Sequence, residues 1–376
     1  MHILIAPNAF KNSMTADKAA LAIREGLQQS RLSCSCECFP IGDGGNGTTA
    51  LIISSRKGTW VEARVQDPLG REILTGFGLI DEGKTAVIEM ADAAGLQHLS
   101  SSELNPLVAD SYGCGQLVVK ALNAGVSQII LGMGGSATVD GGTGILRALG
   151  LRFLDAAGQP LPRRPECLTG LHTIDITGID KRILQVELTV LCDVRNPLLG
   201  EQGAAAVFGP QKGAAEEGVK KLEASLSAFR DICLKQTGRD MALIPSGGTA
   251  GGAAAGLSAF LNARLVNGID HFLEMTRFDE ALAKAGLLIT GEGSIDEQTL
   301  EGKAPFGVAS RAKKRNLPVI GLAGKVPLVK NPALDQYFDV LLAIGNEPTT
   351  LPAAMEHTAG NLIRISRAIG NLLAIS

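Results

Sequence analysis

Clusters of glycine and polar residues follow short apolar runs along this chain, and that pattern limits its fold more than any other feature. The 46 glycines among 376 residues have no fixed period, which excludes collagen-like and low-complexity chains. The apolar runs have strand length, and several are continuous, as is typical of parallel strands covered on both faces. Strands are expected at Ile3–Ala6, Cys36–Ile41, Thr85–Met90, Gln128–Leu131, Glu187–Cys192, Leu287–Thr290, Val319–Leu322 and Val340–Ile344.

The order of these patterns predicts an α/β fold with two domains. Strands alternate with helical patterns most clearly at the two ends of the chain. The segment Val61–Met90 instead contains two turn signals, which predict antiparallel hairpins. We therefore expect a flavodoxin-like, doubly wound domain made of residues 1–60 and 280–376, and an inserted mixed α/β domain made of residues 61–279.

Charge and composition limit the classes of partner. With 35 basic and 38 acidic residues and 4% aromatics, the chain has no basic excess for a nucleic-acid backbone and few side chains for base stacking. No apolar run approaches the ~18 residues that a membrane helix needs, and the N-terminus lacks a secretory signal pattern. The seven cysteines are an odd number, typical of free thiols in a reducing compartment. We expect a cytoplasmic protein that binds neither nucleic acid nor membrane, with a homo-oligomer left open.

Five loops share a composition that favours an anionic ligand. Each follows an expected strand and is rich in Gly, Asp, Ser or Lys. Ligands of open α/β sheets bind outside the carboxyl ends of strands, where glycines let backbone N–H groups cradle phosphate oxygens. For any single loop, the alternative is that the glycines only make turns. The five loops are Pro7–Ser13, Gly42–Thr48, Gly132–Gly144, Asp193–Gly200 and Gly291–Lys303.

Four carboxylates in these loops have the chemistry that phosphoryl transfer requires. A carboxylate can accept the proton of an attacking hydroxyl, and Mg²⁺ bound to phosphates prefers one or two carboxylates. Asp43 and Asp193 lie closest to expected strand ends and are candidate catalytic groups. Asp43 and Asp296 are candidate magnesium ligands, and Glu292 is a candidate nucleotide-site residue. Helix capping is the alternative role, most of all for Asp296 and Asp140.

Lysines and hydroxyls complete the expected site. A cation is needed on the phosphates or on a substrate carboxylate, so Lys11 is a candidate catalytic residue and Lys303 a candidate nucleotide ligand. Lys212 is the third loop lysine, and lone lysines are usually solvated. The hydroxyls of Ser136 and Thr138 can bind phosphate or metal, or instead satisfy turn backbone. The expected nucleotide-binding residues are Gly44, Gly134, Gly135, Ser136, Thr138, Glu292 and Lys303.

Two glycine patterns leave other function classes open. The loop that starts at Gly42 fits G-x-G-x-x-G and the loop that starts at Gly132 fits G-x-G-x-x-A, both weak signals of dinucleotide binding. No G-x-x-x-x-G-K-[ST] string is present, so a kinase of this sequence would need another phosphate cradle. The rivals are a nicotinamide-dependent dehydrogenase of a small hydroxy acid and a non-catalytic phosphometabolite-binding protein. The second rival would not need four carboxylates at strand ends.

Many strings along the chain match one known family in order, among them IAPNAFKNSMTA, PIGDGGNGT, DPLGR, IEMADAAGL, GMGGSATVDGGTG, LCDVRNPLLG, VFGPQKGA and ITGEGSIDEQTLEGKAPFGVA. Through them the chain resembles the type I bacterial glycerate kinase family over essentially its whole length. It departs from the usual family pattern at Asn8, Asn46 and Val139, where Asp, Glu and Asn are usual. The resemblance implies a two-domain α/β enzyme of organic acid catabolism that uses ATP and Mg²⁺ to phosphorylate D-glycerate. It implies 2-phosphoglycerate as the product, with 3-phosphoglycerate left open.

Overall fold

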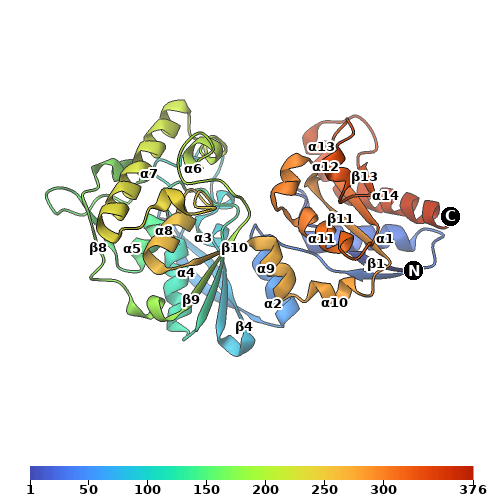
Figure 1. Cartoon of the computed structure of the whole chain (residues 1–376), viewed down its shortest axis with the longest axis horizontal. Coiled ribbons are helices and arrows are strands. Elements are labelled where there is room, and N and C mark those ends of the chain that lie inside the picture. Colours follow the sequence, from blue (N-terminus) through green and yellow to red (C-terminus); the bar gives the residue numbers. More distant parts are fainter. Residues whose placement is uncertain (376) are drawn as a thin grey trace. The chain divides into compact units, whose positions relative to one another are not determined.

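A computed structural model describes residues 1–375, and the chain forms two compact α/β units (Figure 1). Unit 1 contains Met1–Asp43 and the chain from Ile269 onward, and unit 2 contains Gly44–Gly268. The α/β fold expected from the sequence is confirmed. The expected domain limits, residues 1–60 with 280–376 and residues 61–279, stay a prediction, because compact units need not coincide with domains that fold alone.

Unit 1 is built on a five-stranded parallel sheet. Numbered within the unit, the strand order is 2-1-3-4-5, the flavodoxin-like order that the sequence predicts. The order reverses between β1 and β11, and ligands of such sheets bind at the carboxyl edge beside this reversal. The strands are β1 (His2–Ile5), β2 (Ser35–Cys38), β11 (Leu287–Ser294), β12 (Val319–Lys325) and β13 (Val340–Ala343).

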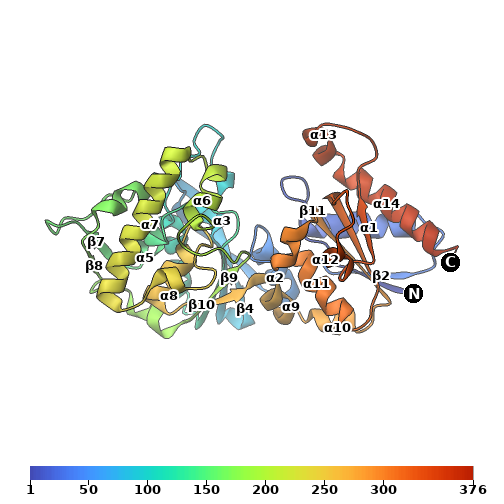
Figure 2. The same ribbon diagram turned by 45° about the horizontal axis from the view of Figure 1, so that its top comes forward.

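Helices cover both faces of this sheet. The helices α1 (Ala16–Gln28) and α14 (Thr358–Leu373) lie side by side and share one apolar cluster with Ile3 and Ile5 (Figure 2). The helix α11 (Ala304–Lys313) packs against β11 and β12 outside that cluster, so it covers the other face. The shorter helices are α9 (Gly268–Met275), α10 (Phe278–Leu282), α12 (Pro332–Asp335) and α13 (Leu351–Glu356).

Unit 2 contains a mixed sheet of the order β10-β9-β6-β5-β4-β3. The first four strands are parallel, and the β3–β4 and β4–β5 pairs are antiparallel, which confirms the hairpins expected between Val61 and Met90. Neither β10 nor the small β7–β8 pair was expected from the sequence. The strands are β3 (Thr59–Gln66), β4 (Glu72–Ile80), β5 (Thr85–Glu89), β6 (Gln128–Gly132), β7 (Arg152–Leu154), β8 (Thr173–Asp175), β9 (Glu187–Cys192) and β10 (Arg264–Asn267).

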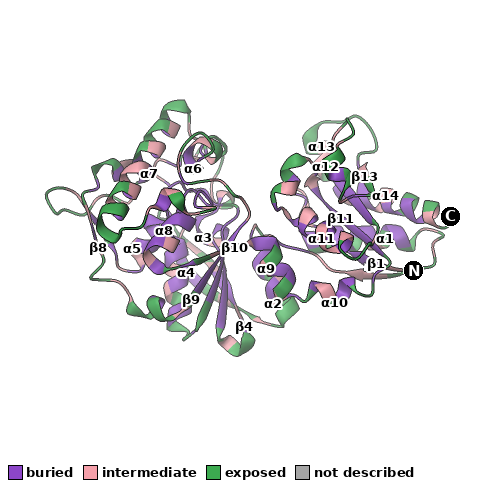
Figure 3. Ribbon diagram, in the orientation of Figure 1, coloured by how far each residue is buried: buried purple, intermediate pink, exposed green. Residues whose placement is uncertain are grey.

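The helices of unit 2 pack around its sheet, whose central strands β5, β6 and β9 are largely buried (Figure 3). Most of them pack on the face that carries Ile129 and Leu131, while α2 packs on β4 and β5. Within residues 1–375, none of the helices is long and apolar enough to cross a membrane. The helices are α2 (Thr48–Arg56), α3 (Ala91–Ala94), α4 (Tyr112–Asn123), α5 (Thr143–Ala148), α6 (Ala204–Phe208), α7 (Glu216–Thr237) and α8 (Ala253–Leu261).

The close packing of α1 against α14 generates a matched pair of glycine substitutions. A Cβ atom at Gly26 would lie 2.3 Å from the Ile363 carbonyl oxygen, whereas a Cβ atom at Gly360 would meet nothing within 4 Å. We expect Gly26→Ala to lower the free energy of unfolding by about 1–3 kcal/mol through overpacking. We expect Gly360→Ala to be neutral or to stabilise by up to ~1 kcal/mol through helix propensity. Urea denaturation checks both, and equal effects would refute the packing argument.

Candidate functional site

Unit 1 places a buried carboxylate and its charged neighbours at the carboxyl edge of its sheet. Glu292 is 9% exposed, and burial raises the pKa of its carboxyl to about 7. The positive charge of Lys303 opposes this rise, while the negative charges of Asp43 and Asp296 add to it. The Asn8 amide donates a hydrogen bond of 3.1 Å to Asp43 Oδ2. The structure therefore brings together four of the charged residues that the sequence selected.

Two of these carboxylates lie elsewhere in their elements than expected. Glu292 is within strand β11, which continues to Ser294, and not in a loop. Asp43 does not directly follow its strand, because β2 ends at Cys38 and not at Ile41. Pro40 has no N–H group for the ladder, although the chain still runs beside β1 and Ile41 N–H donates to the Pro7 carbonyl at 3.0 Å.

Asp296 has the helix-capping role that was its alternative. Its Oδ1 accepts the Gln298 N–H at 3.0 Å at the start of the short helix Glu297–Glu301, and its Oδ2 accepts the Ser294 hydroxyl at 3.2 Å. The Thr299 hydroxyl accepts the Asp296 N–H at 3.1 Å and donates to Glu292 Oε1 at 3.2 Å. Asp296 is thus connected to Glu292 through one threonine. Lys11 lies on the loop after β1 with an exposed side chain.

In unit 2, glycines allow two loops to touch through their backbones. The Gly134 N–H donates to the Gly44 carbonyl at 2.9 Å, and a Cβ atom at Gly134 would lie 2.5 Å from the Gly45 Cα. Gly44 has a φ of +95°, and a Cβ atom there would lie 2.9 Å from the Leu191 Cβ. Gly44 and Gly134 are therefore required by packing, and both N–H groups have protein acceptors, since the Gly44 N–H donates to Thr48 Oγ1 at 3.1 Å.

Protein carboxylates occupy two helix N-termini that looked available to phosphate. Glu89 accepts the N–H groups of Gly47 at 3.0 Å and Thr49 at 2.6 Å at the start of α2. Asp140 accepts the N–H groups of Gly142 and Gly144, each at 3.0 Å, at the start of α5. A carboxylate at such a position satisfies the free donors of the first turn and the helix dipole. These two loops are thus held by internal anions at their helix ends.

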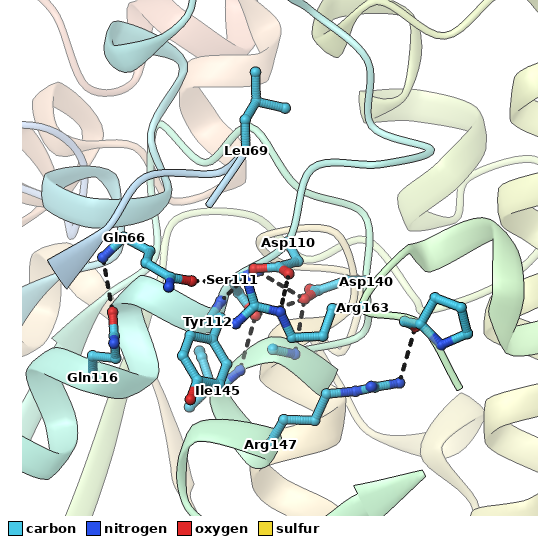
Figure 4. A network of polar contacts seen from close by, with 12 residues as sticks. Gln66, Leu69, Asp110, Ser111, Tyr112, Gln116, Asp140, Ile145, Arg147 and Arg163 are labelled. Carbon is cyan, nitrogen blue, oxygen red and sulfur yellow. Dashed lines mark hydrogen bonds and ion pairs between the residues drawn. The ribbon is translucent and has the colours of Figure 1, made fainter. Parts of the chain in front are cut away.

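Asp140 is also the centre of a polar network (Figure 4). It is fully buried, and its Oδ2 accepts both the N–H and the hydroxyl of Ser111, the latter at 2.6 Å. Asp110, the residue before Ser111, forms an ion pair with Arg163 at 3.2 Å, and the Arg163 guanidinium lies 4.0 Å from the centroid of the Tyr112 ring. Burial raises the pKa of Asp110 to about 6. The capping role given as the alternative for Asp140 is therefore the one the structure shows.

A buried lysine from another segment also contacts the loop after β6. Lys212, at the end of the short helix Pro210–Lys212, is 4% exposed, so the expectation that it is solvated is wrong. Its Nζ donates to Ser136 Oγ at 3.0 Å and to the Thr138 carbonyl at 2.8 Å. Burial lowers the pKa of Lys212 to about 8, while the charges of Asp140 and Asp193 oppose this. Asp193 follows β9 directly, as expected.

Sequence reasoning missed three contributors to this part of unit 2. Glu89 was taken only as part of a strand, and Asp92 was not selected, although burial and the charge of Glu89 raise its pKa to about 7. The glycine-rich segment 247–252 packs on the loop after β6, since Gly141 N–H donates to the Gly251 carbonyl at 3.0 Å. A carboxylate at the end of an apolar run was the available signal for Glu89 and Asp92.

The buried carboxyl of Glu292 generates a prediction about pH. Its folded pKa of about 7 exceeds the ordinary value of 4.5, so the stability it contributes is present at low pH and is lost as pH rises through 7. Relative to the wild type, Glu292→Gln should become more stable from pH 5 to pH 8, by roughly 2–3 kcal/mol. Thermal unfolding at both pH values measures this, with the exposed Glu301→Gln as control. A difference that does not depend on pH would contradict it.

Comparison with known proteins gives the family. Residues 3–374 match the model of the glycerate kinase family. The chain is 42% identical over 367 residues to a glycerate kinase of Halalkalibacterium halodurans, covering 98% of this chain and 97% of that protein. It is 41% identical over 379 residues to a glycerate 2-kinase of Escherichia coli, covering 100% of this chain and 98% of that protein.

A solved structure agrees with the sequence comparisons. The crystal structure of a protein described as glycerate kinase 2 from Salmonella typhimurium LT2 superposes with a TM-score of 0.82 at 39% identity. The match covers 99% of this chain and 98% of that one. Family model, relatives and structure each span nearly the whole sequence, so the chain is an enzyme of the glycerate kinase family.

Proposed function

We propose that this enzyme phosphorylates D-glycerate to 2-phosphoglycerate with ATP and Mg²⁺. The observation that carries the proposal is the placement of charged side chains at the carboxyl ends of parallel strands in both units, in a chain of the glycerate kinase family. A relative that is 41% identical is named glycerate 2-kinase, which supports the 2-position of the product. We also propose a cytoplasmic location, because ATP is a cytoplasmic substrate.

Asp193 is the proposed group that acts on the glycerate hydroxyl. It follows the buried strand β9 without an intervening residue, so its backbone is fixed at the sheet edge. A carboxylate in such a position can accept the hydroxyl proton as phosphate is transferred. Asp43 and Lys11 are the proposed catalytic groups of unit 1: Asp43 is held by Asn8, and the exposed Lys11 can reach an anionic substrate.

The carboxylates of unit 1 fit a magnesium ion that is bound together with nucleotide phosphates. Among residues 1–375, no three or more His, Cys, Asp or Glu side chains are grouped to hold a metal on their own. Mg²⁺ needs only one or two carboxylates when phosphates supply other ligands. Asp43 and Asp296, proposed as these ligands, both act electrostatically on Glu292, and this local excess of negative charge suits a cation. Bound Mg²⁺ would neutralise charge on the phosphates.

The nucleotide-binding residues remain those that the sequence selected, with roles that the contacts make more specific. In unit 2 the backbone at Gly135 and the hydroxyls of Ser136 and Thr138 are proposed to receive phosphate oxygens. Gly134, whose N–H donates to the Gly44 carbonyl, and Gly44 are proposed to shape the loop that holds them. In unit 1, Lys303 is the proposed phosphate cation, and its charge also acts on Glu292.

A direct assay tests the function. Incubation with D-glycerate and MgATP should give 2-phosphoglycerate, identified by phosphorus NMR against 2- and 3-phosphoglycerate standards, and removal of divalent cations should abolish turnover. NADH should not bind. An enzyme that binds NADH and forms no phosphoglycerate would refute the proposal, and 3-phosphoglycerate as the only product would refute the 2-position.

Replacing Asp193 tests the proposed base. Asp193→Asn should lower kcat by roughly 10²–10⁴-fold, because the amide keeps the shape but cannot accept the proton. The same change removes one of two carboxylates that oppose the lowered pKa of buried Lys212, so we also expect a modest loss of thermal stability. Asp231→Asn, at an exposed position on α7, is the matched control. Near-normal kcat in folded Asp193→Asn would assign the base to another residue.

A further inference from the structure

The contact between Lys212 and Ser136 has a direction that matters for function. The Lys212 ammonium can only donate hydrogen bonds, so Ser136 Oγ is the acceptor at 3.0 Å. Because its oxygen accepts from Lys212, the hydroxyl hydrogen of Ser136 must point away from the ammonium. Within the part of the chain that the structure describes, Ser136 donates this hydrogen to no protein acceptor.

The Lys212 ammonium also indicates which ligand the hydroxyls of this loop bind, phosphate or metal, the two that the sequence leaves open. A divalent cation on Ser136 Oγ would lie close to a buried positive charge, which already uses one of the two lone pairs of that oxygen. An oxyanion would instead receive the free hydroxyl hydrogen and be attracted by the ammonium. The geometry therefore favours phosphate over metal at Ser136.

Two further observations support an oxyanion at this place. The Thr138 hydroxyl is fully buried and has no hydrogen-bond partner among the described residues, a costly state for a group that no ligand uses. Asp193, the proposed base, is one of the two charges that act on Lys212. In phosphoryl transfer the attacking hydroxyl and the transferred group are neighbours, so a base and a phosphoryl donor contact belong together.

We propose that Lys212 is a positioning residue for phosphoryl transfer: its ammonium fixes the Ser136 hydroxyl as a hydrogen-bond donor to the transferred γ-phosphoryl group of ATP. This inference rests on the proposed function and assigns a role to a lysine outside the set selected from the sequence. Lys212 acts through Ser136, and Ser136 contacts the nucleotide.

The contact with Lys212 also makes hydrogen-bond donation by the Ser136 hydroxyl depend on pH. The charged groups acting on Lys212 are Asp140, after β6, and Asp193, after β9, and with burial they leave its pKa at about 8. Above that pH the neutral amine gains a lone pair and can accept the Ser136 hydrogen, which turns the hydroxyl away from the phosphate. The specificity constant for ATP should therefore fall as pH rises above 8.

Nucleotide binding without glycerate tests the proposal apart from turnover. Isothermal titration calorimetry with MgATP and MgADP should show that Lys212→Met and Ser136→Ala each weaken ATP by roughly tenfold or more, and ADP by less than about twofold, because only ATP has the γ-phosphate. The double variant should be no weaker than the worse single variant, since Lys212 acts through Ser136. Lys220→Met, which removes an exposed lysine of α7, is the matched control.

The pH profile is a readout that a merely structural lysine would not change. In the wild type, kcat/KM for ATP should fall about tenfold per pH unit well above pH 8. In Lys212→Met and Ser136→Ala the lower, residual value should stay flat over that range. Thr138→Val removes the unpartnered hydroxyl, so it should leave stability unchanged or raised while it lowers kcat.

Several outcomes would overturn the proposal. Equal losses of ATP and ADP affinity would show that Lys212 only supports the loop, and a raised KM for glycerate with an unchanged ATP-to-ADP ratio would place the cation on the substrate carboxylate. If Lys212→Met does not fold, Ser136→Ala carries the same comparison. A wild type that binds ATP in this way yet forms no phosphoglycerate would refute the proposed function and leave this inference standing.

Discussion

The buried carboxylate of Asp140 is the interaction on which the site of unit 2 depends. It has no exposed surface, and its two oxygens accept hydrogen bonds from Gly142, Gly144 and Ser111. These bonds offset the cost of burying the charge, and the charge in turn helps to keep Lys212 protonated inside the protein. The Asp140 carboxylate therefore determines both the shape of this loop and the charge around Lys212. Removal of that charge would release the helix start, the serine and the lysine together.

The fold could be predicted from the sequence because its signals are local. Short apolar runs, several of them continuous, marked all eight expected strands, and the turn signals after Val61 marked the hairpins. Errors occur where a strand edge is set by a neighbour: β2 ends before Pro40, and β11 continues through Glu292 because it pairs with β12 there. β10 was missed because it is short and only partly buried.

The candidate site could be predicted less well, because residue type does not give hydrogen-bond direction or burial. Asp193 directly follows β9, as the sequence predicts, and Asp43 acts electrostatically on Glu292. The sequence could not show that Glu89 and Asp140 occupy the helix starts after the glycine loops, since these bonds join distant segments. It also could not show that Lys212 is buried, because the loop that it contacts, at Ser136, lies 76 residues away in the sequence.

The central position of β1 in its sheet has a consequence for how the chain is made. β1 pairs with β2 on one side and with β11 on the other, and Leu287, the first residue of β11, is synthesised far later than Ile5. At ribosomal rates this delay is roughly 15–60 s, time in which unit 2 can fold while one edge of β1 has no partner. An unpaired strand edge is a template for association with other chains. The interval before unit 1 is complete therefore favours association of this edge with other chains, and the speed of translation through unit 2 sets its duration.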